Sequence, residues 1–169
     1  HYYALDEFDN PAYSRRSMES AITRFTASLK AKILAHLSCK RRQGIRIYGT
    51  GLFYVWCREI NRSDNEHYHF LLMLNHDEYH TLGEYGEDNL SALIIDAWMS
   101  ATGITRRQAA RCVYFVRKYR LKQKKDNFEY HLQKLFNDAC YLAKKETKQY
   151  GSRRKNFGTS RPFHEAYLN

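Results

Sequence analysis

The chain has 169 residues, of which 43% are hydrophobic, and this is enough for one domain with a sizeable core. It contains no apolar run near the ~18 residues of a membrane span and no signal-peptide pattern at its start, so we expect a cytoplasmic protein. The formal net charge of +10 favours a polyanionic partner, above all nucleic acid, over a merely soluble basic surface.

The first predicted element is a helix that begins near Ser17 and ends at the sequence KRRQG, residues 40–44. Its apolar residues recur at helical spacing, at Ile22, Phe25, Leu29, Ile33 and Leu37. A short apolar run at residues 45–48 follows, and Gly49 and Gly51 mark a bend after it.

Residues 52–74 have the pattern of a β-hairpin. The apolar run 52–60 and the run 67–74 are separated by the polar sequence NRSDNE, which predicts a turn between two antiparallel strands.

The rest of the chain predicts two more helices and one short strand. Asn89 is the expected N-cap of a helix over residues 90–102, which stops at Gly103. Residues 113–116 predict a short strand, and residues 128–148 a third helix. No linker or repeat interrupts the chain. The sequence therefore predicts a single α+β domain, residues 1–169, with a mostly antiparallel sheet flanked by helices.

Charge and cysteine usage refine the class of protein. Residues 1–105 carry 11 Lys or Arg against 13 Asp or Glu, whereas residues 106–169 carry 17 against 5. The basic half is where we expect a nucleic acid to bind. The four cysteines are scattered and form no CxxC pair, which indicates reduced core residues rather than a zinc site or disulfides.

A candidate metal site comes from EHYHFLLMLN, residues 66–75. Alternation along a strand places His67 and His69 on one face and Tyr68 on the other. If the hairpin forms, Glu59 lies beside the two histidines at the same end of the ladder. Two imidazoles and a carboxylate suit a divalent ion such as Mg²⁺ or Mn²⁺, although zinc and the Fe(II) of oxygenases use similar ligands. The alternative is a pair of polar histidines on a wet face and a solvated Glu59.

A candidate nucleophile lies on the third helix. The expected core stripe of this helix is Phe128, Leu132, Leu135, Phe136, Ala139 and Ala143. Tyr141 falls off this stripe and shares its face with Lys134, Lys145 and Lys148, with Lys144 at the edge. Positive neighbours favour the phenolate form of a tyrosine, and the same lysines would hold a phosphodiester. The alternative is an exposed tyrosine on a solvated basic face.

The histidine pair and the tyrosine helix together resemble the motifs of a known group of proteins. A histidine–hydrophobe–histidine strand followed by a helix with Y-x-x-K resembles the HUH superfamily of single-strand DNA endonucleases, which includes rolling-circle replication initiators and conjugative relaxases. The strings WCREINRSDNEHYHFLLMLN, DAWMSATG, YLAKKETK and FGTSR are more closely similar to the inovirus gene II protein family. Its members are replication initiation proteins of filamentous phages and related prophages, and the similarity covers residues 22–161.

The resemblance implies a set of roles for residues of this chain. It implies His67 and His69 as metal ligands, Tyr141 as nucleophile and Lys144 as the motif lysine, and it adds Glu59 as third ligand because Glu59 precedes the pair. The reaction implied is nicking of single-stranded or origin DNA, with a 5′-phosphotyrosine intermediate and a free 3′-hydroxyl for rolling-circle replication. Such a protein works in a bacterial cell with a separate helicase and polymerase and needs no membrane.

The resemblance also implies a first strand that the pattern does not clearly supply. Initiators of this kind usually have an apolar first strand with its own motif, whereas this chain starts at His1 with the sequence HYYALD. Either that strand precedes residue 1, or residues 45–48 take its place.

Basic and polar residues near the C-terminus are the expected DNA contacts: Lys145, Lys148, Arg153, Arg154, Lys155, Thr159, Ser160 and Arg161. Gly158 would let the backbone approach a phosphate, or would form an ordinary turn before Pro162. Two other functions stay open at this point. One is a non-catalytic module that binds an origin or hairpin, and the other is a relaxase or transposase of another mobile element.

Overall fold

A computed structural model describes residues 21–60, 66–83, 89–116, 118–122, 125, 127–141 and 155–161, excluding the side chains of Ile60 and Tyr141. The chain divides into two compact units, one formed by His1–Thr50 and Asn75–Val116, the other by Gly51–Leu74 and Arg117–Asn169. Each unit is assembled from two separate stretches, so no single point on the chain divides them. This agrees with the absence of a linker in the sequence.

The first unit is built on the long helix α2 (Ala21–Arg42). Its buried residues include the five apolar positions of the predicted stripe, which are Ile22, Phe25, Leu29, Ile33 and Leu37. These residues pack toward α3 (Leu90–Thr102), where the ring of Phe25 lies 5.5 Å from that of Trp98. Each fully buried aliphatic side chain here contributes about 1.5–3 kcal/mol. The predicted first helix is therefore confirmed over the described residues, and its predicted start near Ser17 lies outside them.

Helix α3 has the predicted caps at both ends. The Asn89 Oδ1 accepts a hydrogen bond from Ala92 N at 3.2 Å, and Gly103 closes the helix in the left-handed conformation with φ of 76°. The Gly103 N–H donates to Met99 O at 2.8 Å. The helix, its start and its stop are confirmed.

The segment after α3 differs from the prediction. Helix α4 (Arg106–Cys112) was not predicted, and it begins with a capping box in which Thr105 and Gln108 each bond to the other's backbone. The predicted strand at 113–116 is wrong: among these residues only Val113 makes an isolated bridge. Helix α4 buries only Ala109 and Cys112, too few apolar positions for a helical period. Its signal was the T-x-x-Q capping box.

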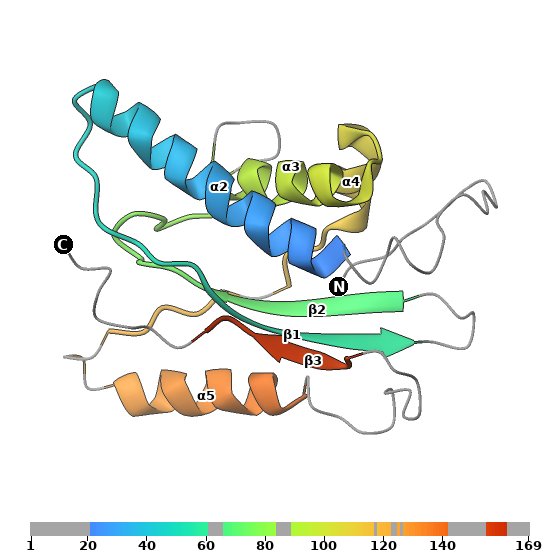
Figure 1. The fold of residues 1–169 in the computed structure, drawn as a ribbon. Coiled ribbons are helices and arrows are strands. Elements are labelled where there is room, and N and C mark those ends of the chain that lie inside the picture. The colour runs from blue at the N-terminus through green and yellow to red at the C-terminus, as the bar shows by residue number, and fades with distance from the viewer. Residues whose placement is uncertain are drawn as a thin grey trace. The chain divides into compact units, whose positions relative to one another are not determined.

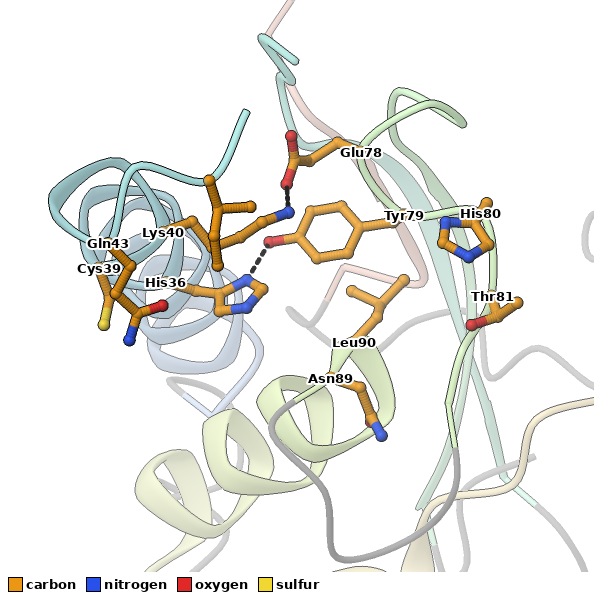
Figure 2. A pocket seen from close by; sticks show the side chains of 11 residues that line it. His36, Cys39, Lys40, Gln43, Glu78, Tyr79, His80, Thr81, Asn89 and Leu90 are labelled. Carbon is orange, nitrogen blue, oxygen red and sulfur yellow. Dashed lines mark hydrogen bonds and ion pairs between the residues drawn. The ribbon is translucent and has the colours of Figure 1, made fainter. Parts of the chain in front are cut away.

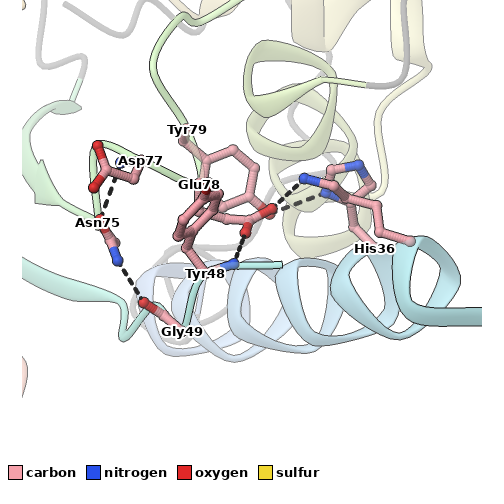
Figure 3. Close-up of polar contacts among 8 residues, drawn as sticks. His36, Tyr48, Gly49, Asn75, Asp77, Glu78 and Tyr79 are labelled. Carbon is pink, nitrogen blue, oxygen red and sulfur yellow. Dashed lines mark hydrogen bonds and ion pairs between the residues drawn. The ribbon is translucent and has the colours of Figure 1, made fainter. Parts of the chain in front are cut away.

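The segment at 45–48 is not a strand either. It is irregular, and the side chains of Ile45 and Tyr48 are exposed. Its position is fixed by the carboxylate of Glu78, whose Oε2 accepts a hydrogen bond from Tyr48 N at 2.5 Å (Figure 3). Nearby, Asn75 donates to Gly49 O at 2.7 Å. Because these bonds run to a loop, residues 45–48 do not provide the first strand that the resemblance implies.

A pocket of about 380 Å³ lies between α2 and the loop after β2 (Figure 2). The side chain of Glu78 is fully buried there and forms an ion pair with Lys40, while His36 Nδ1 lies 3.0 Å from the Tyr79 hydroxyl. A buried carboxylate is stable only when its charge is compensated, and Lys40 and Tyr48 N supply that compensation. The cluster joins the loop to the helix within this unit.

The second unit contains the sheet. Strands β1 (Phe53–Ile60) and β2 (Glu66–Met73) form the predicted hairpin, and β3 (Phe157–Thr159) pairs antiparallel with the other side of β1. The order is therefore β2-β1-β3, with β1 in the middle (Figure 1). Four helices and three antiparallel strands among the described residues confirm the α+β class.

Helix α5 (Phe128–Tyr141) belongs to the second unit. It starts where predicted, and the predicted continuation to Lys148 lies outside the described residues. Of the expected core stripe, Leu132 is 38% and Phe136 60% exposed, so this stripe is only partly buried. The Tyr119 hydroxyl donates a hydrogen bond to Asp138, which ties the helix to the preceding segment.

Two smaller expectations can also be compared with the fold. All four cysteines are free, and Cys57 and Cys112 are buried as expected, whereas Cys140 is exposed on α5. Within the described part of the chain, no helix is long and apolar enough to cross a membrane.

Candidate functional site

The hairpin register brings the three predicted ligands to one face of the sheet. Glu59 lies directly opposite His67, and Cys57 lies opposite His69. The Nε2 of His69 is 3.0 Å from Oε2 of Glu59. An ionised carboxylate only accepts hydrogen bonds, so the imidazole donates. The prediction that Glu59 lies beside the histidines is confirmed.

The histidines are not on a wet face. His67 is 8% exposed and His69 is 9% exposed, which is unusual for polar side chains on a strand. A buried imidazole costs free energy unless its nitrogens have partners, and Glu59 is one such partner for His69. The interpretation of the pair as solvated surface residues is therefore wrong.

The chemistry of Glu59, His67 and His69 fits a divalent ion, but their present geometry is not that of a finished metal site. Across the described residues, no group of three or more His, Cys, Asp or Glu side chains is arranged to hold a metal. Glu59, His67 and His69 are the side chains that would hold such an ion, which would supply a positive charge at this face, and in this structure His69 and Glu59 are bonded to each other instead.

The face of the hairpin opposite the histidines carries a buried ionic cluster that the sequence did not predict. Arg58 is 3% exposed and donates from NH1 to Glu66 Oε1 and from NH2 to Asn156 Oδ1, both at 3.0 Å. The Tyr68 hydroxyl donates to Glu66 Oε2 at 2.6 Å. The Glu66 carboxylate is thus bonded on the face opposite the histidines. The only sequence signal was Arg58 facing Tyr68 in the hairpin register.

The cluster also fixes the register on which the histidine face depends. Since side chains alternate, a slip of one residue would move Glu59 to the other face and bring Arg58 beside the histidines. The bonds of Arg58 to Glu66 in β2 and to Asn156 before β3 oppose such a slip from both sides.

The nucleophile candidate lies at the edge of the described region. Tyr141 is the last residue of α5, and its side chain lies outside what the structure describes. Lys134, one of its expected face neighbours, is exposed. The remaining basic candidates, Lys144, Lys145, Lys148, Arg153 and Arg154, lie outside the described residues.

The FGTSR segment is a strand rather than a turn or a phosphate loop. Gly158 faces Trp56, and a Cβ at position 158 would overlap the Trp56 indole, so the close approach that requires glycine is to this ring. The Oγ of Ser160 accepts a hydrogen bond from Tyr54 N at 3.2 Å, which gives Ser160 a role in holding the strand. The predicted DNA contacts Lys155, Thr159 and Arg161 are all exposed.

Comparison with known proteins places the chain in a family. The YagK/YfjJ C-terminal domain family matches residues 6–160. The chain belongs to this family. It is 36% identical to the "Uncharacterized protein YfjJ" of Escherichia coli (strain K12) over 162 residues, which cover 92% of this chain and 78% of YfjJ. It is also 36% identical over 159 residues to the "Uncharacterized protein YagK" of the same strain, covering 92% of this chain and 76% of YagK. No solved structure matches the chain.

Proposed function

We propose that this member of the YagK/YfjJ family is a replication initiation endonuclease that nicks single-stranded or origin DNA through Tyr141. The observation that supports this most is the placement of Glu59, His67 and His69 on one face of the hairpin, with both histidines buried. Two imidazoles and a carboxylate brought together in this way form the donor set for a divalent ion such as Mg²⁺ or Mn²⁺. The family names carry no activity, so the proposal rests on this chemistry and on the resemblance to HUH endonucleases.

The proposed reaction needs little from the protein beyond position and charge. The Tyr141 oxygen attacks the scissile phosphorus and loses its proton, a P–O bond forms to tyrosine, and the bond to the 3′-oxygen breaks. A divalent ion bound at the histidine face would neutralise the charge that grows on the phosphate oxygens. Lys144, Lys145 and Lys148 follow Tyr141 in the sequence and would favour its phenolate form.

The products explain why such an enzyme needs no nucleotide cofactor. The 3′-oxygen takes up a proton and leaves as a free hydroxyl, which can prime synthesis by a separate polymerase behind a separate helicase. The energy of the phosphodiester is kept in the 5′-phosphotyrosine, so reversal of the transfer can close the circle.

The test is formation of a covalent adduct. We expect wild-type protein and Mn²⁺ to yield a protein–DNA band on a denaturing gel with a pool of single-stranded oligonucleotides. We expect the band to disappear with EDTA and in Tyr141→Phe. Tyr130→Phe, on the same helix, is the matched control and should retain it. An adduct in Tyr141→Phe would contradict the assignment of the nucleophile.

A non-catalytic module that binds an origin or hairpin is the second candidate. It is favoured by the direct bond between Glu59 and His69, which gives each side chain a polar partner without an ion. This candidate predicts DNA binding that EDTA does not change, and no adduct with any origin substrate. A relaxase or transposase would give the same adduct and differ only in the DNA that it recognises.

A further inference from the structure

Strand β3 presents a row of exposed side chains that points to how DNA is held. From residue 155 to residue 161, exposed and half-buried positions alternate without exception. Asn156, Gly158 and Ser160 are the half-buried positions, turned toward the side of Arg58 and Trp56. The exposed positions are Lys155, Phe157, Thr159 and Arg161.

This row lies on the histidine face of the sheet. Phe157 pairs with Cys57, which in turn pairs with His69, so the three residues share one face. Thr159 pairs with Val55 on the same face. The backbone bonds Arg58 N to Asn156 O at 2.8 Å and Ser160 N to Tyr54 O at 2.9 Å continue the pairing beyond both ends of β3. The row is therefore extended along its length.

The order of the row fits a single strand of nucleic acid. Lys155 and Arg161 place a cation at each end, about 20 Å apart in an extended chain, and a strand of several nucleotides spans that distance. Phe157 is 40% exposed, which leaves part of its ring surface to solvent. An exposed aromatic ring between two cations is the arrangement that holds single strands without reading sequence.

The row also leads toward the proposed catalytic end of the hairpin. Asn156 bonds to Arg58, so Lys155 lies at the end of β1 that carries Glu59. A strand laid along β3 from Arg161 to Lys155 would arrive beside Glu59, which pairs with His67 on the far side of β1. Along this path the DNA would not have to pass over the buried side chain of Cys57.

We propose that Lys155, Phe157, Thr159 and Arg161 form a binding track for single-stranded DNA, in which the Phe157 ring stacks on one base. The track rests on the proposed function for its ligand, and it adds Phe157 to the residues that contact DNA. The Thr159 hydroxyl is placed to donate to a phosphate between the two cations.

The test separates base stacking from charge. Binding is measured by fluorescence anisotropy in EDTA with the Tyr141→Phe protein, so that no covalent step contributes. Two oligonucleotides of equal length are compared, one of thymidines and one with abasic sites in its centre. We expect Phe157→Ala to weaken binding of the thymidine strand at least about fivefold and to change abasic binding less than about twofold.

Two further variants show whether a loss of binding comes from the missing ring or from misfolding. Phe157→Trp keeps a ring and should retain affinity for the thymidine strand, and Phe136→Ala removes an even more exposed phenylalanine from α5 and should leave it unchanged. An unchanged affinity in Phe157→Ala, an equal loss on both oligonucleotides, or no binding by the parent protein would overturn the track. None of these results depends on nicking, which the adduct gel decides separately.

Discussion

The bond from His69 to Glu59 joins two of the three residues that we propose as metal ligands. The half-buried Glu59 carboxylate accepts a hydrogen bond from the buried His69 imidazole, so each group has a polar partner in the other. If a divalent ion binds as proposed, these two side chains would hold it together with His67.

We expect Mn²⁺ to raise the melting temperature of the protein if the three residues bind it. At a metal concentration of 100 times Kd the stabilisation is about 2.7 kcal/mol, or roughly 5–10 °C for a chain of this size. Glu59→Gln keeps the shape and a hydrogen-bonding oxygen but removes the charge, and it should lose most of this rise. The measurement is differential scanning fluorimetry in a metal titration. His76→Ala, in the other compact unit, is the control and should shift like wild type; equal shifts in Glu59→Gln and wild type would refute the ligand set.

At the scale of elements, the sheet depends on a third strand of only three residues. Strand β3 is held by pairing with β1, by the Asn156 bond to Arg58 and by the fit of Gly158 under the Trp56 indole. A short strand gains little from its own residues, so these contacts decide whether the edge of the sheet forms.

We expect Gly158→Ala to lower the free energy of unfolding by about 1–3 kcal/mol, because the new methyl group displaces the indole or the strand. Urea denaturation followed by circular dichroism measures this loss. Gly49→Ala is the matched control, since a Cβ there meets no atom within 4 Å. Similar midpoints for the two variants would mean that the Trp56 contact does not limit how β3 packs. If β3 carries the proposed track, the DNA affinity of Gly158→Ala should fall too.

Helices α2 and α3 show what makes an element predictable. In α2 five apolar residues recur at helical spacing, and all five are buried, while in α3 the N-cap Asn89 and the closing Gly103 bound an apolar run. Helix α4 lacks such a stripe and was missed, although its capping box was present. Local signals and burial must agree before a pattern is decisive.

At the scale of the whole molecule, the proposed function makes the affinity for DNA depend on the charge distribution more than on any single contact. The net charge is +10, and the excess of basic residues is concentrated after residue 105. A single-stranded partner releases counterions as it binds, so affinity falls with salt at a slope of about −0.7 per phosphate contact.

We therefore expect the double variant Lys155→Ala, Arg161→Ala to bind single-stranded DNA more weakly and with a logarithmic salt slope reduced by about 1.4. The measurement is a series of anisotropy titrations at increasing NaCl. Lys30→Ala, an exposed lysine of α2 in the other unit, should leave the slope nearly unchanged. A slope that falls equally in both proteins would indicate diffuse attraction instead of a track.

The sequence by itself determined the features that depend on local pattern. It predicted the α+β class, the first helix, the capped helix at 90–102 and the hairpin, and hence the placement of Glu59 beside His67 and His69. These follow because a turn and two alternating strands fix which residues face each other, with no help from the rest of the chain.

Only the tertiary structure decided the features that join distant segments. The burial of His67 and His69 is such a feature. The bond of Arg58 to Asn156 across 98 positions and the pairing of Phe157–Thr159 as the third strand both depend on a contact between residues 53–60 and 155–161. The three residues FGT are too few to predict a strand from their pattern. Nothing in the local sequence shows that Gly158 leaves room for the Trp56 ring. Only this pairing determines on which face of the sheet the exposed row from Lys155 to Arg161 lies.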